Sequence, residues 1–232
     1  MSKHPSFWVV IPAAGVGSRM RADRPKQYLQ LADRTILEHT LDCFLGHPGL
    51  KGMVVSLAAD DPWWPSLGYA SDPRIRRAEG GVERADSVLG GLRLLSELGA
   101  GADDWVLVHD AARPNLARED LDRLLSELAG DPVGGLLAVP VRDTLKRAGP
   151  DGRVLETVDR SVIWQAYTPQ MFRFSALQEA LVGALAENVA ITDEASALEW
   201  AGQSPRLIEG RADNLKITRP EDLQWLQQRW KS

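Results

Sequence analysis

The sequence predicts an α/β protein with a mostly parallel mixed sheet flanked by helices. Short apolar runs such as residues 7–11, 53–57, 105–109 and 135–141 alternate with segments of helical periodicity, which is the pattern of a parallel sheet with crossover helices. Small and polar residues follow several of these runs directly. The chain has 232 residues, 44% of them hydrophobic, so we expect one domain, residues 1–232, with a substantial core.

The composition narrows the expected partners and compartment. The net charge is −5 and no tract rich in Lys or Arg occurs, so nucleic acid is not an expected partner. Cys43 is the single cysteine, and a chain without an internal disulfide is typical of a reducing compartment. No run approaches the roughly 20 apolar residues that a membrane span requires. We therefore expect a cytoplasmic protein with no membrane contact.

The first apolar run ends in a loop of small residues that suits a polyphosphate, because backbone N–H groups there can approach an anion closely. The loop contains Pro12, Ala13, Ala14, Gly15 and Gly17. Arg19 and Lys26 follow and place two positive charges near such an anion. The Gly-x-x-x-x-Gly-Lys-[Ser/Thr] spacing is absent, and Met20 stands at the third glycine of the dinucleotide fingerprint. A dehydrogenase is therefore disfavoured, and a plain strand-to-helix turn remains an alternative.

Helical periodicity and stop residues place the other elements. Helices are expected over residues 35–45, 84–98, 118–128, 175–187 and 195–200, with a last helix that starts at Thr218. The stretches 175–178 and 218–221 have the pattern of capping boxes, and Thr192 is the expected cap of the helix over 195–200. Residues 164–172 are expected to be extended or irregular and to return the chain to the core.

Two glycines before the helix over 84–98 suit contact with a nucleobase. The bare backbone of Gly80 and Gly81 allows a planar ring to lie close. Ser87, in the first helical turn, offers a hydroxyl that can donate or accept toward a pyrimidine edge. Gly81 and Ser87 are therefore candidate base-binding residues, and an ordinary polar first turn is the alternative.

A third group of polar residues follows the apolar run 105–109, at the edge of the sheet where ligands collect in this class of fold. The carboxylate of Asp110, which precedes Ala111, can hold a divalent cation that bridges phosphates. Arg113 can fork onto a second anionic group. A local Asp110–Arg113 ion pair is the alternative. His109 has no metal-ligating neighbour beyond Asp110, so we expect it to be a packed residue at the strand end.

Residues 143–160 form two short segments across a Pro-Asp-Gly turn, which predicts a β-hairpin. Much of both faces of this hairpin is polar or charged. An isolated two-stranded hairpin of this kind is marginally stable at best. We therefore expect it to project from the sheet and to find a partner.

Several of these stretches together resemble a known family. The residues around Pro12–Met20 and Pro25–Tyr28 resemble the opening of nucleotidyltransferases, and most closely the 2-C-methyl-D-erythritol 4-phosphate cytidylyltransferase family. The stretches GGVERADSV, HDAARP, PVRDTLKR and EGRADNLKIT extend the resemblance over nearly the whole chain. It implies a Rossmann-like nucleotidyltransferase domain, CTP and 2-C-methyl-D-erythritol 4-phosphate as substrates, and Mg²⁺ as cofactor. The chain departs from the family at Val82, where an acid is usual.

The resemblance also implies roles for individual residues. Arg19 and Lys26 would stabilise the transition state and the leaving pyrophosphate, and Asp110 would hold Mg²⁺ on the triphosphate. The residues expected beside the attacking substrate are Arg113, Thr144, Arg160, Thr168, Thr192 and Lys216. A homodimer formed through residues 143–160 is implied as well.

Two alternatives share parts of this pattern. A nucleotidyltransferase of the sugar-phosphate or molybdopterin type would share the first loop but not the whole set of later stretches. A non-catalytic nucleotide-sensing domain would keep the glycines and lose Arg19 or Lys26, and both are present.

Overall fold

A seven-stranded sheet forms the centre of the computed structural model, which describes the chain apart from residues 1–3, 16, 18–19, 21 and 231–232. Its strands are β1 (Phe7–Pro12), β4 (Leu50–Leu57), β5 (Ile75–Glu79), β6 (Trp105–Val108), β7 (Gly134–Pro140), β10 (Trp164–Arg173) and β11 (Arg206–Glu209). They lie in the order β11-β7-β10-β6-β1-β4-β5. Among these described strands only β10 runs antiparallel to its neighbours β6 and β7. The predicted mostly parallel mixed sheet is confirmed.

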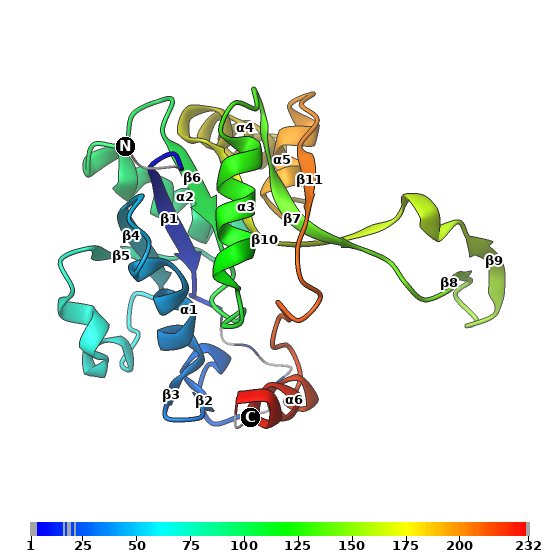
Figure 1. Cartoon of the computed structure of the whole chain (residues 1–232), viewed down its shortest axis with the longest axis horizontal. Helices are drawn as coiled ribbons and strands as arrows, with labels where there is room; N and C mark the ends of the chain where they lie inside the picture. The colour runs from blue at the N-terminus through cyan, green and yellow to red at the C-terminus, as the bar shows by residue number, and fades with distance from the viewer. Residues whose placement is uncertain (1–3, 16, 18–19, 21, 231–232) are drawn as a thin grey trace.

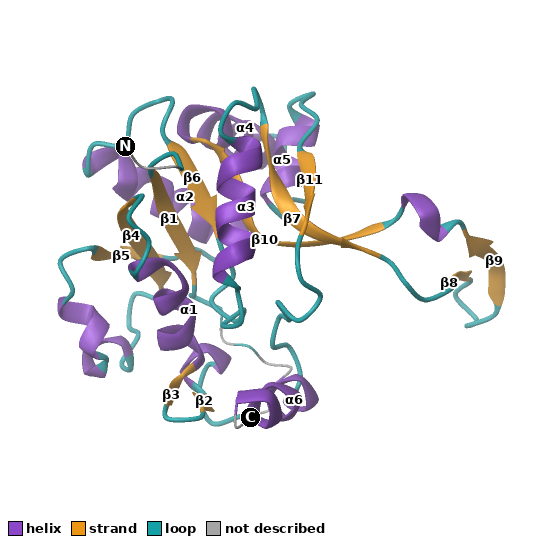
Figure 2. Ribbon diagram, viewed as in Figure 1, coloured by secondary structure: helices purple, strands orange, loops and turns teal. Residues whose placement is uncertain are grey.

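Helices cover both faces of this sheet, as Figure 2 shows. They are α1 (Ile36–Leu45), α2 (Arg84–Glu97), α3 (Arg118–Leu128), α4 (Phe174–Ala186), α5 (Glu194–Trp200) and α6 (Pro220–Trp230). Because successive strand side chains point to opposite faces, Val9 and Ile11 pack with α1 and α3, whereas Val10 packs with α2, α4 and α5. The two apolar cores hold the carboxyl end of β1 firmly between them.

Strand β10 decides between the two alternatives given for residues 164–172. The segment is extended and forms a ten-residue strand, 164–173, inside the sheet. Its pairing with β7 shifts register between Ala166 and Gln170, around Pro169, which has no N–H to donate to the ladder. That interruption, together with several polar residues, obscures the strand pattern in the sequence.

The helix starts also differ in detail from their predictions. Helix α4 begins at Phe174 without a side-chain cap, so the capping box over 175–178 is wrong. Asp193, not Thr192, caps α5 by accepting from the Ser196 N–H at 2.9 Å. Helix α6 begins at Pro220. The carboxylate of Asp222 accepts from the backbone N–H groups of Thr218 and Arg219, each at 2.8 Å. In α5 an aspartate therefore replaces the expected threonine as the acceptor, whereas in α6 Asp222 takes the place of Glu221, the acid of the expected capping box.

A third, smaller apolar core lies beside the carboxyl edge of the sheet. The hairpin β2 (Gln30–Leu31) and β3 (Arg34–Thr35) packs there with α6. Its buried side chains are Met20, Leu31, Ile36, Ala112, Ile217 and Leu226. This core joins the segment after the first loop to the C-terminal part of the chain.

The β-hairpin predicted over 143–160 projects from the rest of the molecule as an arm, to the right in Figure 1. Strands β8 (Leu145–Ala148) and β9 (Val154–Val158) pair antiparallel at its end. Val154 and Leu155 are 60% and 66% exposed, so the arm carries apolar side chains that its own chain does not cover. Within the described part of the chain, no helix has the length and apolar character needed to cross a bilayer.

Candidate active site

A cavity of about 500 Å³ opens at the carboxyl ends of β1, β5 and β6. It is lined by Pro12, Ala13, Ala14, Gly15, Gly17, Lys26, Gln27, Gly81, Val82, Glu83, Arg84, Ser87, Asp110, Ala111, Ala112 and Lys216. Every residue predicted to bind the nucleotide is on this wall, together with the two predicted lysines. Arg19 lies outside the described residues.

The side chains of Gln27 and Lys26 contact the backbone of the small-residue loop and fix it at the cavity. The side chain of Gln27 is buried, and its Nε2 donates to the carbonyl of Ala13 at 2.6 Å. Gly17 has φ = +65°, and a Cβ there would lie 2.9 Å from Cγ of Lys26. Glycine is therefore required both by the backbone and by the lysine stem that packs against it. The Lys26 ammonium donates to the carbonyl of Ile217 at 3.0 Å.

The glycine pair after β5 closes the opposite wall. A Cβ at Gly80 would lie 2.4 Å from Cβ of Ala14, so only glycine lets the two loops approach this closely. The Gly81 N–H donates to the Ser87 hydroxyl at 3.1 Å, and that hydroxyl donates to the Glu83 carbonyl at 3.2 Å. Ser87 therefore shapes the loop, and the loop backbone faces the cavity.

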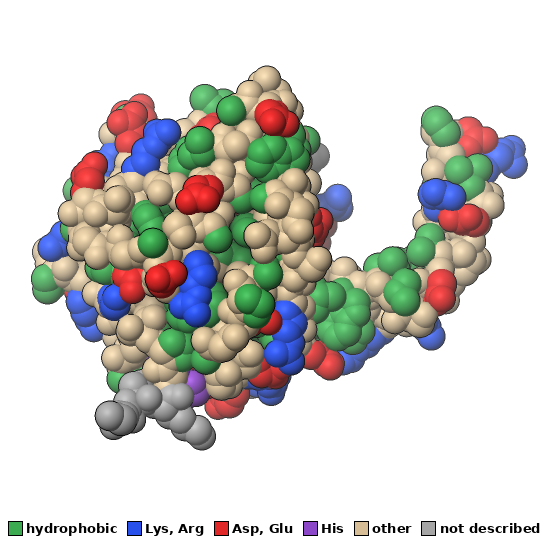
Figure 3. Space-filling view, turned by 90° about the horizontal axis from the view of Figure 1, so that it is seen from above, with side chains coloured by type: hydrophobic (Ala, Val, Ile, Leu, Met, Phe, Trp, Pro, Cys, Tyr) green, Lys and Arg blue, Asp and Glu red, His purple; other side chains and the backbone are tan. Residues whose placement is uncertain are grey.

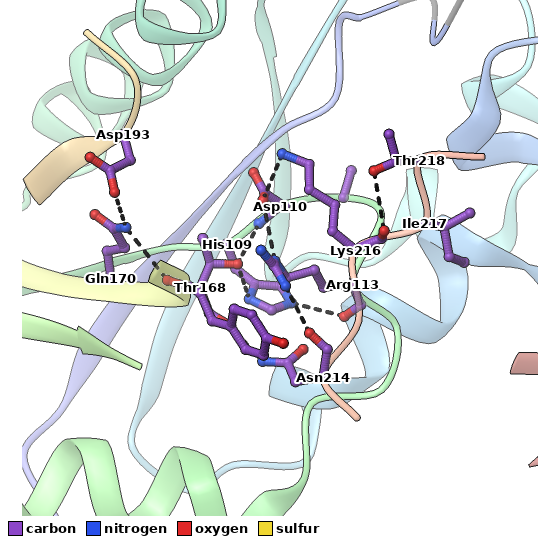
Figure 4. Close-up of polar contacts among 12 residues, drawn as sticks. His109, Asp110, Arg113, Thr168, Gln170, Asp193, Asn214, Lys216, Ile217 and Thr218 are labelled. Carbon is purple, nitrogen blue, oxygen red and sulfur yellow. Dashed lines mark hydrogen bonds and ion pairs between the residues drawn. The ribbon is translucent and has the colours of Figure 1, made fainter. Parts of the chain in front are cut away.

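Asp110 is the centre of charge in the site (Figure 4). One carboxylate oxygen lies 3.0 Å from Nε of Arg84, and the other lies 3.0 Å from Nζ of Lys216 and 3.4 Å from Nε of Arg113. Burial by itself raises the pKa of Asp110, but Arg84, Lys216 and Arg113 outweigh burial and hold this pKa well below its usual range. The carboxylate is therefore ionised in the folded protein at any physiological pH.

Arg84 is a site residue that sequence reasoning missed. Its guanidinium forms a bidentate ion pair with Glu194, at 2.6 and 3.0 Å, in addition to its contact with Asp110. Burial lowers the pKa of Arg84, but Glu194 and Asp110 outweigh it and the net pKa is raised. Glu194 is fully buried and lies 110 positions after Arg84 in the chain. Nothing local to the stretch 80–88 indicates so distant a partner.

Arg84→Met should lower the free energy of unfolding by about 2–3 kcal/mol. Removing one partner of a buried ion pair costs about 3–5 kcal/mol, and the remaining solvent access of Arg84 reduces this. Urea unfolding followed by circular dichroism measures the change. Arg93→Met, at an exposed position of the same helix, is the control. Equal stability of the two variants would contradict a structural role for the Arg84–Glu194 pair.

Arg113 and Thr168 lie behind the cavity wall rather than on it. Arg113 is buried, donates to the carbonyl of Asn214 at 2.7 Å and stacks over the ring of Tyr167 at 4.5 Å. Burial lowers the pKa of Arg113 despite the nearby carboxylate of Asp110. Thr168 is 4% exposed, and its hydroxyl bonds to the ring of His109. His109 is a fully buried residue at the strand end, as predicted.

The remaining predicted substrate residues are away from the cavity. Thr144 and Arg160 lie in the arm and are exposed, and the Arg160 guanidinium donates to the carbonyl of Arg142. Thr192 is exposed just before α5. None of the three lines the cavity of its own chain.

The donor set at Asp110 fits a divalent cation that arrives with a nucleotide. Among the described residues there is no cluster of three or more metal-ligating side chains. Mg²⁺ at nucleotide sites commonly takes only one or two carboxylates and completes its shell with phosphates and water. Since both oxygens of Asp110 already contact cations, Mg²⁺ would fit only together with phosphate oxygens that offset its charge.

Comparison with known proteins agrees with this geometry. Residues 7–228 match the model of the family 2-C-methyl-D-erythritol 4-phosphate cytidylyltransferase. The enzymes of that name from Ectopseudomonas mendocina (strain ymp) and Pseudomonas fluorescens (strain SBW25) are 76% identical over 224 residues and 74% identical over 226 residues. Each match covers 97% of this chain, and 95% and 96% of the relative. The crystal structure of the Francisella tularensis enzyme is similar with a TM-score of 0.84 and 35% identity, over 98% of this chain and all of that one.

Proposed function

This chain belongs to the 2-C-methyl-D-erythritol 4-phosphate cytidylyltransferase family, and we propose that the cavity at β1, β5 and β6 is the place of that reaction. The enzyme transfers CMP from CTP to 2-C-methyl-D-erythritol 4-phosphate and releases pyrophosphate, in the non-mevalonate route to isoprenoid precursors. One observation carries the proposal. A single cavity brings the small-residue loop together with Lys26, Asp110 and Lys216.

The chemistry requires charge stabilisation rather than a general base. A phosphate monoester has a second pKa of about 6, so the attacking oxygen is already largely deprotonated near neutral pH. The barrier arises from bringing this dianion to a triphosphate and from charge on the transferring group. Positioned cations and N–H donors lower that barrier. This agrees with a cavity that contains lysines and backbone N–H groups, while His109 is buried behind it.

We assign the cations as follows. Lys26 contacts the transferring and leaving phosphates, since its stem is held by Gly17 at the small-residue loop. Arg19, which lies outside the described residues, is assigned to the same phosphates. Lys216, whose ammonium lies 3.0 Å from the Asp110 carboxylate, contacts the phosphate of the attacking alcohol. Asp110 would hold Mg²⁺, and the ion would supply positive charge that offsets the charge of the triphosphate.

CTP should be preferred over UTP by about 5- to 150-fold in kcat/KM, because a carbonyl of Gly80 or Gly81 accepts from the cytosine amino group. Uracil places an oxygen there, and a buried acceptor facing an acceptor costs about 1–3 kcal/mol. Ser87→Ala should reduce this preference because Ser87 holds the Gly81 N–H. Ser96→Ala, exposed on the same helix, is the control. Equal kcat/KM for both nucleotides would place base recognition elsewhere.

We further propose a homodimer formed through the arm. The arm projects away from the cavity of its own chain (Figure 1) and exposes Val154 and Leu155, and Val162 just after the arm is exposed as well. Figure 3 shows apolar side chains along the arm and near its base. A two-fold partner would cover these side chains and receive Thr144 and Arg160 beside its own cavity.

Release of pyrophosphate tests the assigned reaction directly. The assay offers CTP, UTP, ATP and GTP in turn, with and without 2-C-methyl-D-erythritol 4-phosphate. We expect release only with CTP and the alcohol phosphate together, apart from weak activity with UTP. Release from CTP without the alcohol phosphate, or release with ATP or GTP, would contradict the proposed use of the cavity.

A further inference from the structure

A buried tyrosine lies two positions after Lys26, in the same three-residue turn. Tyr28 is 2% exposed, and its hydroxyl donates to Oδ2 of Asp61 at 2.9 Å. Asp61 is 8% exposed and lies in the loop that follows β4. Its other oxygen, Oδ1, accepts the backbone N–H groups of Trp63 and Trp64 at 3.0 and 2.9 Å. The carboxylate therefore joins the turn that contains Lys26 to the loop at the end of β4.

Tyr28 is the donor in this bond. Burial and the nearby Asp61 carboxylate raise the pKa of Tyr28, so the hydroxyl keeps its proton at physiological pH. A hydrogen bond from a neutral hydroxyl to a carboxylate is charge-assisted and stronger than one between neutral groups. The ring of Tyr28 also stacks on the ring of Trp63, with the centroids 5.5 Å apart. Packing thus places the ring, and the hydroxyl bond fixes where its end lies.

The turn over residues 26–28 depends on its side chains for its position. Its backbone bonds are of the 3₁₀ type, at 2.9 and 3.1 Å, and such turns have poorer hydrogen-bond geometry than an α-helix. Its two buried side chains reach the ends of two neighbouring strands. Gln27 bonds to the carbonyl of Ala13 after β1, at 2.6 Å, and Tyr28 bonds to Asp61 after β4. The turn is therefore tied to the sheet at two points.

Lys26 is the residue whose position these contacts decide. Its stem packs against Gly17, and its ammonium donates to the carbonyl of Ile217 at 3.0 Å. Lys26 lines the active-site cavity, whereas Tyr28 and Asp61 do not. Asp61 lines a second cavity, of about 420 Å³. A change at the Tyr28–Asp61 bond can therefore reach the reaction through the turn, without contact to a substrate.

We propose that Tyr28 and Asp61 are positioning residues for CMP transfer: their hydrogen bond holds the turn so that the Lys26 ammonium meets the phosphates, and neither residue touches a substrate. This rests on the proposed role of Lys26. The carboxylate of Asp61 would repel a triphosphate, which agrees with its place outside the active-site cavity. Because Lys26 is assigned to the charge that develops during transfer, a misplaced ammonium lowers kcat more than it raises KM.

Tyr28→Phe removes the hydroxyl and keeps the ring, its stacking on Trp63 and the bond of Gln27. We expect kcat to fall about 5- to 20-fold, less than the roughly 100-fold cost of a 1 Å misplacement, while KM for both substrates changes less than about twofold. Steady-state release of pyrophosphate measures both. Tyr69→Phe is the matched control, since it removes a hydroxyl that donates to Asp42 at 2.7 Å in an exposed pair, and its kcat should equal that of the wild type. Equal kcat in the two variants would overturn the proposal.

Lys26→Met separates the positioning of this lysine from a general effect on the site. If Tyr28 acts through the Lys26 ammonium, Tyr28→Phe should change kcat less than about twofold once that ammonium is gone. The comparison is between Lys26→Met and the variant that carries both changes, each assayed with enzyme in excess over CTP. The same fold loss of kcat with and without the ammonium would show that Tyr28 acts by another route, and the proposal would be wrong.

Asp61→Asn examines the acceptor of the bond. An amide has one acceptor oxygen where the carboxylate has two, so it cannot accept from the Tyr28 hydroxyl and from the two backbone N–H groups at once, and kcat should fall. In a chain that already carries Tyr28→Phe, the same change should lower kcat no further, because the bond is already absent. An equal loss in both chains would show that Asp61 acts apart from Tyr28. If thermal unfolding shows that Asp61→Asn does not fold, the Tyr28→Phe comparisons decide by themselves.

The Lys26→Met variant also distinguishes this proposal from the proposed function beneath it. If Lys26→Met retains wild-type turnover, the assigned role of Lys26 fails and the positioning proposal fails with it. If Lys26→Met is inactive while Tyr28→Phe turns over normally, only the proposal for Tyr28 and Asp61 fails.

Discussion

Lys26→Ala should lower kcat about 100- to 1,000-fold, the usual cost of removing one donor to a transition state. Lys26 lies on the cavity wall against Gly17, with its ammonium at the carbonyl of Ile217. The stem of Lys26 packs against Gly17 of the small-residue loop, so phosphates that bind at this loop would meet its ammonium. Steady-state release of pyrophosphate measures the loss, and thermal unfolding checks that the fold is kept.

Lys26→Met is the matched control for the stem of this lysine. Methionine retains an unbranched side chain against Gly17 and removes only the charge. We expect the same loss of kcat as in Lys26→Ala, because the charge and not the packing supports the reaction. Near-normal turnover in either variant would remove Lys26 from the mechanism, and recovery in Lys26→Met alone would assign the effect to packing.

Mixing two inactive variants should restore about a quarter of wild-type activity. This result is expected if each active site takes the small-residue loop with Lys26 from one chain and the arm with Arg160 from the other chain. The variants are Lys26→Ala and Arg160→Ala, unfolded together in equal amounts and refolded. About half of the dimers are then mixed, and each mixed dimer has one site with both halves intact and one with both halves defective. The exposed position of Arg160 on the projecting arm motivates the experiment.

The control for this experiment replaces one partner by a chain that carries both changes. Lys26→Ala mixed with the variant that has both substitutions cannot form an intact site, so its activity should stay at the level of the parents. Mixed dimers are demonstrated by a size or affinity tag on one chain. If mixed dimers form and the first mixture also stays inactive, Arg160 acts within its own chain and the shared-site proposal is wrong.

Local sequence patterns were sufficient for most strands of the sheet and for one side of the site. The apolar runs at 7–11 and 105–109 each precede small or polar residues, and parallel strands align such junctions at one edge of the sheet. The loop from Pro12 to Gly17 and the carboxylate of Asp110 therefore meet in the cavity as predicted. The segment 164–173 was not recognised as a strand, because Pro169 and polar residues interrupt its pattern.

The sequence by itself determined the class of fold, the small-residue loop, the acid at the end of β6 and the family, because each depends on residues close together in the chain or on motifs in order. Tertiary structure alone decided which charges meet: Arg84 with Glu194, 110 positions apart, and Lys26 with the carbonyl of Ile217, 191 positions apart. It also turned Thr168 inward, toward His109. Such contacts depend on how the packed faces of the sheet and the third core bring distant segments together, and no local pattern encodes that distance.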